Sequence, residues 1–486
     1  MKDFSKITEE LAVLQERTDW AQGTERIGRL LEKHGAELDR GEKSFLYGRL
    51  GYFLRFLERA EESAAAYREA VLYAPYLAQQ RKLYSDYLLI CHYLPHVSDE
   101  ELAESHFFYQ NFFRPKEELQ HVRDDHRRHS KIRIGYLSSN FKTHIMSCFM
   151  MQLLALADRD RFEVYCYDLG GLSDGAAEQM KSFGNIWRNI ALPEAKERAR
   201  TIAADEIDIL FDLGVHTDGG HGLATLGYKA APVQIAGIGY MSTSGLKAVD
   251  YYLSDRFLDP PGKGDAYFSE KLLRLSHSHF CYTPFEEIFK STIDWQPHER
   301  PVFGCFNNSA KISEEMLRLW LTLLRRVPGA KLLLKAWKPE ALLEKALSLG
   351  YCRGEIEVRP MTLDYVHEYM DMDIALDTFP YTGGGTTCEA LYMGVPVVTL
   401  AGTRHGTRFG LSLLENVGLG ELVSNTPEEY VEKAAALASD AELLAALHKN
   451  LRPMMQRSPV MDGKSYVREI EAMYEDVWQA WLDGRE

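Results

Sequence analysis

A glycine-rich loop followed by hydroxyl and carboxyl side chains is the stretch of this chain best equipped for chemistry. Residues 379–389 read FPYTGGGTTCE and lie between two short apolar runs. Glycines let backbone N–H groups approach a ligand, and a helix N-terminus favours an anion. The spacing fits a diphosphate cradle made by Gly384, Gly385, Thr386 and Thr387, with Glu389 as an acceptor for a ribose hydroxyl. It fits equally well a flexible turn whose threonines only cap a helix.

Four more polar loops follow apolar runs of strand length. They cover residues 140–144, 214–217, 307–311 and 402–408. Two histidines in these loops, His144 and His216, suit proton transfer. A histidine in a loop is more often structural than catalytic, so the residue types alone leave both roles open.

Alternating strand and helix patterns must position these loops. Apolar runs at residues 132–137, 162–167, 207–213, 233–237 and 251–254 are separated by helical patterns, and a second such series begins near residue 300. This alternation predicts an α/β protein with doubly wound parallel sheets. Two Rossmann-like halves facing a cleft form the GT-B architecture, in which ligands bind beyond the carboxyl ends of the strands.

The sequence pattern in the first part of the chain predicts helices and no strands. Residues 46–75 carry the small and large residues of a tetratricopeptide (TPR) helix pair at the expected spacing, namely Leu46, Gly48, Tyr52, Ala60, Ala64, Tyr67, Ala70 and Pro75. We expect a helical TPR-like region and linker at 1–125, an acceptor-side half at 130–298, a nucleotide-side half at 299–465 and a terminal helix at 466–486. The helical region suits either docking of a protein or capping of the next domain.

Composition narrows the functional classes. The 486 residues carry a formal net charge of −15, which argues against nucleic acid or a membrane surface as the general partner. No apolar run reaches the length of about 18 residues that a membrane span needs. The N-terminus lacks the apolar core of a signal peptide. An odd number of cysteines, 7, without a CxxC pair predicts reduced thiols and a cytoplasmic protein.

A histidine-containing charge run lies between the helical region and the first strand. Residues 121–129 read HVRDDHRRH, which suggests metal ligation, but a solvated linker is the more common role of such a run. The scattered cysteines do not suggest a zinc site either. We therefore expect a connector without a metal.

Long ordered motifs resemble the O-GlcNAc transferase and SPINDLY family of protein glycosyltransferases. The similar stretches include IRIGYLSSNFKTHIMSCFM from residue 132, DILFDLGVHTDGG from residue 208, FGCFNNSAKISEEM from residue 303 and LDTFPYTGGGTTCEALYMGVPVVTLAG from residue 376. The resemblance implies a bacterial SPINDLY-like member with a short TPR region. It also implies inverting transfer of GlcNAc from UDP-GlcNAc to Ser or Thr of a protein, with no cofactor and no metal.

The same resemblance assigns roles to individual residues. Lys311 would hold the donor diphosphate, and either His144 or His216 would act as the general base. Thr217 and Gln234 would orient the acceptor or the sugar. The remaining donor contacts would come from Asn308, Tyr365, Gly384, Gly385, Thr386, Thr387 and Glu389.

Two departures from the family pattern keep the donor open. Tyr365 stands where O-GlcNAc transferases usually carry a histidine that stacks on the base, and the lysine expected near Thr362 is absent. Uracil and guanine both remain as candidates for the base of the donor nucleotide. GDP-fucose and UDP-glucose are therefore alternative donors, and Asn is an alternative acceptor. A nucleotide-sugar epimerase and a non-catalytic TPR scaffold are the other classes. The oligomeric state is open.

Overall fold

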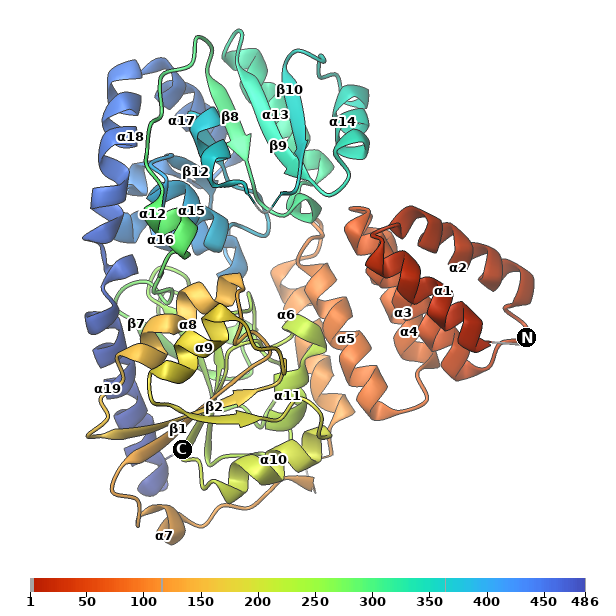
Figure 1. The fold of residues 1–486 in the computed structure, drawn as a ribbon, viewed down its shortest axis with the longest axis vertical. Coiled ribbons are helices and arrows are strands. Elements are labelled where there is room, and N and C mark those ends of the chain that lie inside the picture. The colour runs from red at the N-terminus through yellow and green to blue at the C-terminus, as the bar shows by residue number, and fades with distance from the viewer. Residues whose placement is uncertain (1–3, 115–116, 363, 486) are drawn as a thin grey trace.

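A computed structural model describes residues 4–114, 117–362 and 364–485. Three parts follow one another along the chain (Figure 1): a helical region, a first α/β half and a second α/β half. The helical region consists of α1 (Phe4–Glu16), α2 (Trp20–His34), α3 (Arg40–Phe56), α4 (Ala60–Tyr73), α5 (Leu77–Cys91) and α6 (Asp99–Phe108).

Close helix packing produces the TPR-like pair. The predicted repeat corresponds to α3 and α4, which contact each other along their length. A Cβ on Gly51 of α3 would lie 2.8 Å from the ring of Tyr67 in α4, so only glycine allows this approach. Asp39 and Glu42 form a capping box that begins α3, which satisfies two backbone donors.

Two hydrophobic cores divide the helical region. Helices α1 to α3 share a small core of their own that includes Leu11, Trp20, Ile27 and Phe53. Tyr67 of α4 and Leu88 of α5 belong instead to the large core of the α/β halves. The later helices are therefore a structural part of the α/β body.

The first half is built on a seven-stranded parallel sheet with the order β3-β2-β1-β4-β5-β6-β7. Ile134 of β1 pairs with Val164 of β2 and with Ile209 of β4, so the strand order reverses between β1 and β4. Its strands and helices are β1 (Ile132–Ser138), α8 (Ile145–Ala155), β2 (Phe162–Asp168), α9 (Gly175–Ser182), β3 (Ile186–Asn189), α10 (Ala195–Ala204), β4 (Ile209–Asp212), α11 (His221–Leu226), β5 (Val233–Gly237), β6 (Tyr251–Asp255) and β7 (Lys271–Leu275).

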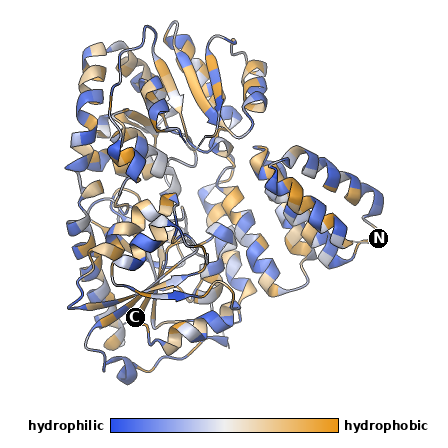
Figure 2. Ribbon diagram, in the orientation of Figure 1, coloured by the Kyte–Doolittle hydropathy of each residue, from blue (hydrophilic) through white to orange (hydrophobic). Residues whose placement is uncertain are grey.

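The second half repeats this plan with six strands in the order β10-β9-β8-β11-β12-β13. Its strands are rich in apolar residues (Figure 2), as burial between helices requires. Its elements are β8 (Val302–Cys305), η5 (Ser309–Lys311), α13 (Glu314–Arg326), β9 (Lys331–Ala336), α14 (Pro339–Ser348), β10 (Ile356–Pro360), η6 (Val366–Asp371), β11 (Ile374–Leu376), α15 (Gly385–Tyr392), β12 (Val397–Leu400), α16 (Phe409–Val417), β13 (Val423–Ser424), α17 (Pro427–Ser439) and α18 (Ala441–Gln456).

The last helix returns to the first half. Helix α19 (Gly463–Leu482) runs along that half (Figure 1) and contacts α8, β5 and β7. The hydroxyls of Tyr136 in β1 and Tyr474 in α19 lie 3.1 Å apart in the core. The C-terminus thus ties the second half to the first.

Two further features of the structure concern membrane-spanning helices and the cysteines. Among the described residues no helix combines the length and the apolarity needed to cross a membrane. All seven cysteines carry free thiols, and six of them are buried.

Candidate active site

A cavity of about 540 Å³ lies where the topology of both sheets predicts a ligand. The strand order reverses between β1 and β4 in one half and between β8 and β11 in the other, and loops after these four strands meet at the cavity. The polar and glycine residues of these loops in its wall are Asn140, His144, Thr217, Asp218, Asn308, Lys311, Gly384, Gly385 and Thr386. The predicted loop 402–408 is not part of this wall.

Lys311 occupies the centre of the nucleotide-side wall. It is the last residue of the short helix η5. Asn308 caps the start of this helix, because its side chain accepts a hydrogen bond of 3.1 Å from the Ala310 amide. Lys311 Nζ donates to the Thr382 carbonyl at 3.1 Å and lies 3.4 Å from the centre of the Tyr381 ring. Burial lowers the pKa of Lys311 to about 8, so its ammonium is mostly charged at neutral pH.

The N-terminus of α15 forms the wall beside Lys311. No side chain among the described residues caps this helix end, so backbone N–H groups of the first turn are available to a ligand. A Cβ on Gly385 would lie 2.3 Å from Ile145 Cγ1, and one on Gly384 would lie 3.1 Å from the Phe280 ring. Glycine is therefore required for packing here as well as for access.

Asp377 and the threonines hold the glycine loop in place. Asp377 Oδ1 accepts hydrogen bonds from the Gly383 amide at 2.7 Å and from Asn307 Nδ2 at 3.0 Å. The Thr386 hydroxyl donates to Asn307 Oδ1 and lies in the cavity wall. Thr387 is buried, and its hydroxyl donates to the Gly383 carbonyl at 3.1 Å. Thr387 thus supports the loop from behind.

Glu389 is engaged by two phenols. Tyr365 donates to one carboxylate oxygen at 2.8 Å and Tyr369 to the other at 3.0 Å. Burial raises the pKa of Glu389 to about 7, while the two hydroxyl donors oppose that shift. Both Tyr365 and Glu389 line the cavity, so a ribose hydroxyl would have to share this carboxylate with the tyrosines.

Lys335 supplies a second lysine that sequence reasoning missed. It projects from β9, is 2% exposed, and donates to Thr362 Oγ1 at 2.8 Å while pairing with Glu368. The sequence lacks a lysine beside Thr362, and the structure brings one there from the neighbouring strand. A lysine inside the apolar run KLLLKA is the signal that could have identified it, because buried lysines need a partner.

His144 faces this wall from the first half. It caps α8, and its Nδ1 accepts a 3.2 Å hydrogen bond from the Met146 amide. Burial lowers the pKa of His144, and the nearby Asp218 carboxylate opposes that shift. The ring is therefore neutral at pH 7, with its lone pair on Nδ1 in this geometry.

Backbone strain surrounds the same part of the cavity. Asp218 and Ile238, both in the wall, have positive φ angles of 53° and 66°. Such angles cost energy in residues other than glycine and concentrate at functional sites. Asp218 is held by Ser139 and by Asn140 Nδ2 at 3.3 Å. Asp218 was missed because sequence patterns do not reveal a strained backbone.

His216 and Gln234 do not reach the cavity. His216 is fully buried, with Nδ1 2.9 Å from Ser85 Oγ and Nε2 3.0 Å from the Ser244 carbonyl. Gln234 is fully buried, and its side chain bonds backbone groups, among them the Ala248 carbonyl at 2.7 Å. Both side chains join segments of the fold, which corrects the expectation that they meet the acceptor or the sugar. The neighbouring Thr217 does line the cavity.

The helical region contributes part of the cavity wall. Arg55 of α3, Leu89 of α5 and Tyr93 line it together with residues of both halves. Contacts outside the cavity support this placement, because the Trp337 ring after β9 meets the Trp20 ring edge-on, with 6.1 Å between centroids. The sequence pattern left open whether the helical region docks a protein or caps the next domain, and it gave no signal for Arg55.

Comparisons with known proteins show the family to which the chain is similar. The model of glycosyl transferase family 41 matches residues 111–294 and 287–470. A Hordeum vulgare protein named "Probable UDP-N-acetylglucosamine--peptide N-acetylglucosaminyltransferase SPINDLY" is 36% identical over 425 residues, which cover 82% of this chain and 43% of that protein. An Arabidopsis thaliana protein of the same name ending in SEC is 29% identical over 377 residues, or 73% of this chain and 38% of that one.

A solved structure extends the likeness to the whole chain. The Thermobaculum terrenum O-GlcNAc transferase, solved as a mutant, has a TM-score of 0.83 at 28% identity, with 100% of both chains covered. This match confirms the predicted GT-B fold with a helical region before it. The chain spans less than half the length of the curated relatives above. On the family match and these relatives, the chain belongs to glycosyl transferase family 41.

Proposed function

We propose that this protein moves GlcNAc from UDP-GlcNAc to a Ser or Thr hydroxyl of another protein, with inversion at the sugar carbon. The observation that carries the proposal is the charged Lys311 beside the uncapped N-terminus of α15 in a cavity between the two halves. The names of the Hordeum vulgare and Arabidopsis thaliana relatives support the donor and the peptide acceptor.

The nucleotide-side wall would stabilise the leaving group. Breaking the bond between the sugar and the diphosphate places negative charge on the phosphate oxygens. The Lys311 ammonium and the first N–H groups of α15 offer positive charge where that charge develops. These groups supply the role that a bound divalent cation has in other sugar transferases, so we expect the transfer step to need no metal.

The first half would receive the proton. His144 caps the N-terminus of α8, which packs against the N-terminus of α15 through Ile145 and Gly385, and His144 lines the same cavity. Inversion requires that the acceptor hydroxyl, with its proton directed to His144, attack the sugar from the side away from the diphosphate. A neutral imidazole suits removal of a hydroxyl proton near pH 7. Because Nδ1 accepts the Met146 amide at 3.2 Å, proton uptake there requires that bond to give way to an acceptor hydroxyl.

A protein acceptor fits the way in which the cavity is built. Arg55, Leu89 and Tyr93 bring the helical region to its wall, and a TPR-like surface suits peptide docking. An epimerase acts on the nucleotide sugar alone and gains nothing from such a wall. A cytoplasmic location, which the cysteine count suggests, and a homo-oligomer both remain predictions.

A donor with another base, as in GDP-fucose, or with another sugar, as in UDP-glucose, is the second candidate. Tyr365 lines the cavity where the resemblance to O-GlcNAc transferases leads one to expect a histidine, and Lys335 brings a different lysine beside Thr362. These changes lie at the end of the cavity where the base would stack. GDP-fucose or UDP-glucose would use the same diphosphate contacts, and an Asn acceptor would use the same docking wall.

Label transfer tests the proposal. Purified protein is incubated with a protein extract and with UDP-GlcNAc, UDP-glucose or GDP-fucose carrying a radioactive sugar, and protein-bound label is counted. We expect label from UDP-GlcNAc with the wild type and at least about 100-fold less with Lys311→Ala. Lys263→Ala, which removes an exposed lysine, is the control and should match the wild type. Equal labelling by Lys311→Ala would contradict the donor site.

A further inference from the structure

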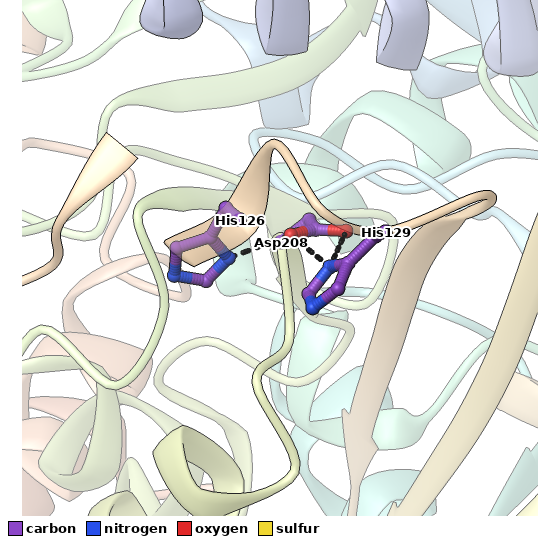
Figure 3. Close-up of side chains that lie close together, drawn as sticks. All are labelled: His126, His129 and Asp208. Atoms are coloured by element: carbon purple, nitrogen blue, oxygen red, sulfur yellow. Dashed lines mark hydrogen bonds and ion pairs between the residues drawn. The ribbon is translucent and has the colours of Figure 1, made fainter. Parts of the chain in front are cut away.

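The connector after the helical region turns two histidines inward. Sequence patterns predict a solvated linker at residues 121–129, but His126 is only 8% exposed and the His129 side chain is also 8% exposed. His126 ends α7 (Arg123–His126), and His129 lies just before β1. Figure 3 shows both rings on either side of the Asp208 carboxylate, so the linker interpretation is wrong for these side chains.

The two imidazoles converge on one carboxylate. His126 Nδ1 lies 2.7 Å from Asp208 Oδ1, and His129 Nδ1 lies 3.0 Å from the same oxygen. Asp208 is fully buried and its Oδ2 accepts the Arg133 amide at 2.8 Å, which fixes the carboxylate at the start of β4. One potential ligand atom from each of the three residues lies within 4.8 Å of the others.

The surroundings resemble the outer shell of a metal site. His129 Nε2 lies 3.2 Å from Glu206 Oε2, and a second carboxylate on the far nitrogen is what usually orients a metal-bound histidine. Arg133 pairs with Glu206 and Glu163, so these two carboxylates and Asp208 surround one guanidinium, while Lys131 and Arg159 line the adjoining cavity. His129 also lines a cavity of about 450 Å³ that offers an access route and room for water.

We propose that His126 Nδ1, His129 Nδ1 and Asp208 Oδ1 bind one divalent transition-metal ion of the zinc type. Two imidazoles and a carboxylate are ligands that zinc prefers, and a water from the adjoining cavity completes four-coordination. Ligands at about 2.0–2.1 Å from zinc are roughly 3.3 Å apart in a tetrahedron, so the Nδ1–Oδ1 distances of 2.7 and 3.0 Å need to lengthen by only about half an ångström or less.

The ion would have a structural role. Asp208 precedes β4, whereas the active-site loop follows the same strand, so the metal site and the catalytic cavity lie at opposite edges of the sheet. The ring of His126 also packs beside Trp478 and Trp481 of α19, with centroids 5.8 and 5.6 Å away. Binding at this point would fasten the connector to the sheet beside the terminal helix without taking part in sugar transfer.

Metal titration tests the site directly. The full-length protein is stripped with a chelator and titrated with Zn²⁺ by calorimetry and with Co²⁺ by visible absorption. We expect one ion per chain, a cobalt spectrum of a nitrogen- and oxygen-ligated site, and a higher midpoint of thermal unfolding with zinc. His129→Asn should abolish the one-to-one binding. Glu206→Gln should weaken it by about 10-fold, because only the outer shell is lost.

His277→Gln is the control variant for the metal titration. It removes an exposed histidine elsewhere in the first half and should bind zinc like the wild type. Absence of stoichiometric zinc binding to the wild type, or equal binding by His129→Asn, would overturn the proposal and leave the cluster as a hydrogen-bonded His–Asp–His group. Should His129→Asn fail to fold, the wild-type cobalt spectrum and the Glu206→Gln titration still decide.

Discussion

Lys311 and Lys335 line the same cavity, yet their neighbours give them different chemistry. Lys335 is paired with the Glu368 carboxylate, so its charge is already balanced. Lys311 donates to the neutral Thr382 carbonyl and lies over the Tyr381 ring. An ammonium with such partners keeps its charge for a diphosphate, which is why Lys311 is the residue on which the proposed chemistry depends.

The lowered pKa of Lys311 predicts a pH profile. For the free enzyme, kcat/KM should fall as pH rises through about 8, because Lys311 then loses its charge. On the acid side, kcat/KM should fall only below pH 6.5, because His144 must be neutral to act as the base and burial lowers its pKa. Lys311→Arg keeps the charge at high pH, so its profile should lose the alkaline fall even if the rate is lower. An unchanged alkaline fall in that variant would contradict the role.

The two histidines should respond differently to mutation. His144→Ala should lower kcat by about 10²–10⁴-fold with little change in donor affinity, because a base acts in the transition state. His216→Ala removes hydrogen bonds to Ser85 and Ser244 in the core and should lower the unfolding midpoint instead. Single-turnover rates, donor titration and thermal melts of both variants separate the cases. Equal loss of kcat and donor affinity in His144→Ala would indicate a binding role.

The sequence predicts some of these residues better than others. Lys311 and Thr386 come shortly after strands, β8 and β11, where composition and position both suggest chemistry. His216 follows a strand in the same way, but its partner Ser85 lies 131 residues earlier in the helical region. A contact at that separation leaves no trace in the local pattern, so burial and not loop position decides the role of His216.

At the scale of elements, the N-termini of α8 and α15 pack against each other in the cavity wall. His144 begins one helix and Gly385 begins the other, and Gly385 lies against Ile145 next to His144. Packing between these two helix ends sets the distance from the proposed base to the donor site. A change in one half should therefore disturb the other.

Gly385→Ala tests this coupling. A Cβ at 2.3 Å from Ile145 Cγ1 must displace Ile145 or α15, and a shift of about 1 Å in a reacting group can cost 10²-fold in rate. We expect a fall of that order in kcat/KM and about 1–3 kcal/mol less stability. Gly175→Ala, at the same position of α9 with open space around it, is the matched control. Equal activity of both variants would contradict the coupling.

Most strands could be predicted because they are short and apolar. The sequence missed β7 (Lys271–Leu275), which reads KLLRL and carries charges at both ends of the apolar pair. It also missed β13 (Val423–Ser424), which has only two residues. Edge strands with mixed polarity carry weak periodic signals, whereas central strands carry strong ones.

For the whole molecule, α19 is the element that unites the two halves. It follows the second half in sequence but packs on the first, where the Asp158 amide donates to Glu471 at 2.7 Å. The sequence predicts the helix but not its location, because one amphipathic face does not specify which half it covers. The same holds for the helical region, because tertiary packing and not the local sequence pattern places it at the cavity.

Tyr474→Ala tests this tie. Tyr474 is 3% exposed and its hydroxyl meets that of Tyr136, so truncation should cost about 3–5 kcal/mol of unfolding free energy. We also expect the two halves to unfold in separate steps in a denaturant titration, since α19 no longer holds them together. Tyr76→Ala, at a position 72% exposed, is the control and should change stability by less than about 0.5 kcal/mol. A single unshifted transition in Tyr474→Ala would contradict this role.

Calorimetric titration with UDP and with GDP, each with and without EDTA, tests the central claim most directly. The proposed site predicts that UDP binds with one site per chain, that EDTA leaves this affinity unchanged, and that Lys311→Ala loses it. EDTA should affect only the structural metal at the other edge of the sheet. Binding of GDP without UDP would assign the other donor class. Absence of binding by either nucleotide would contradict the assignment of the cavity as a donor site.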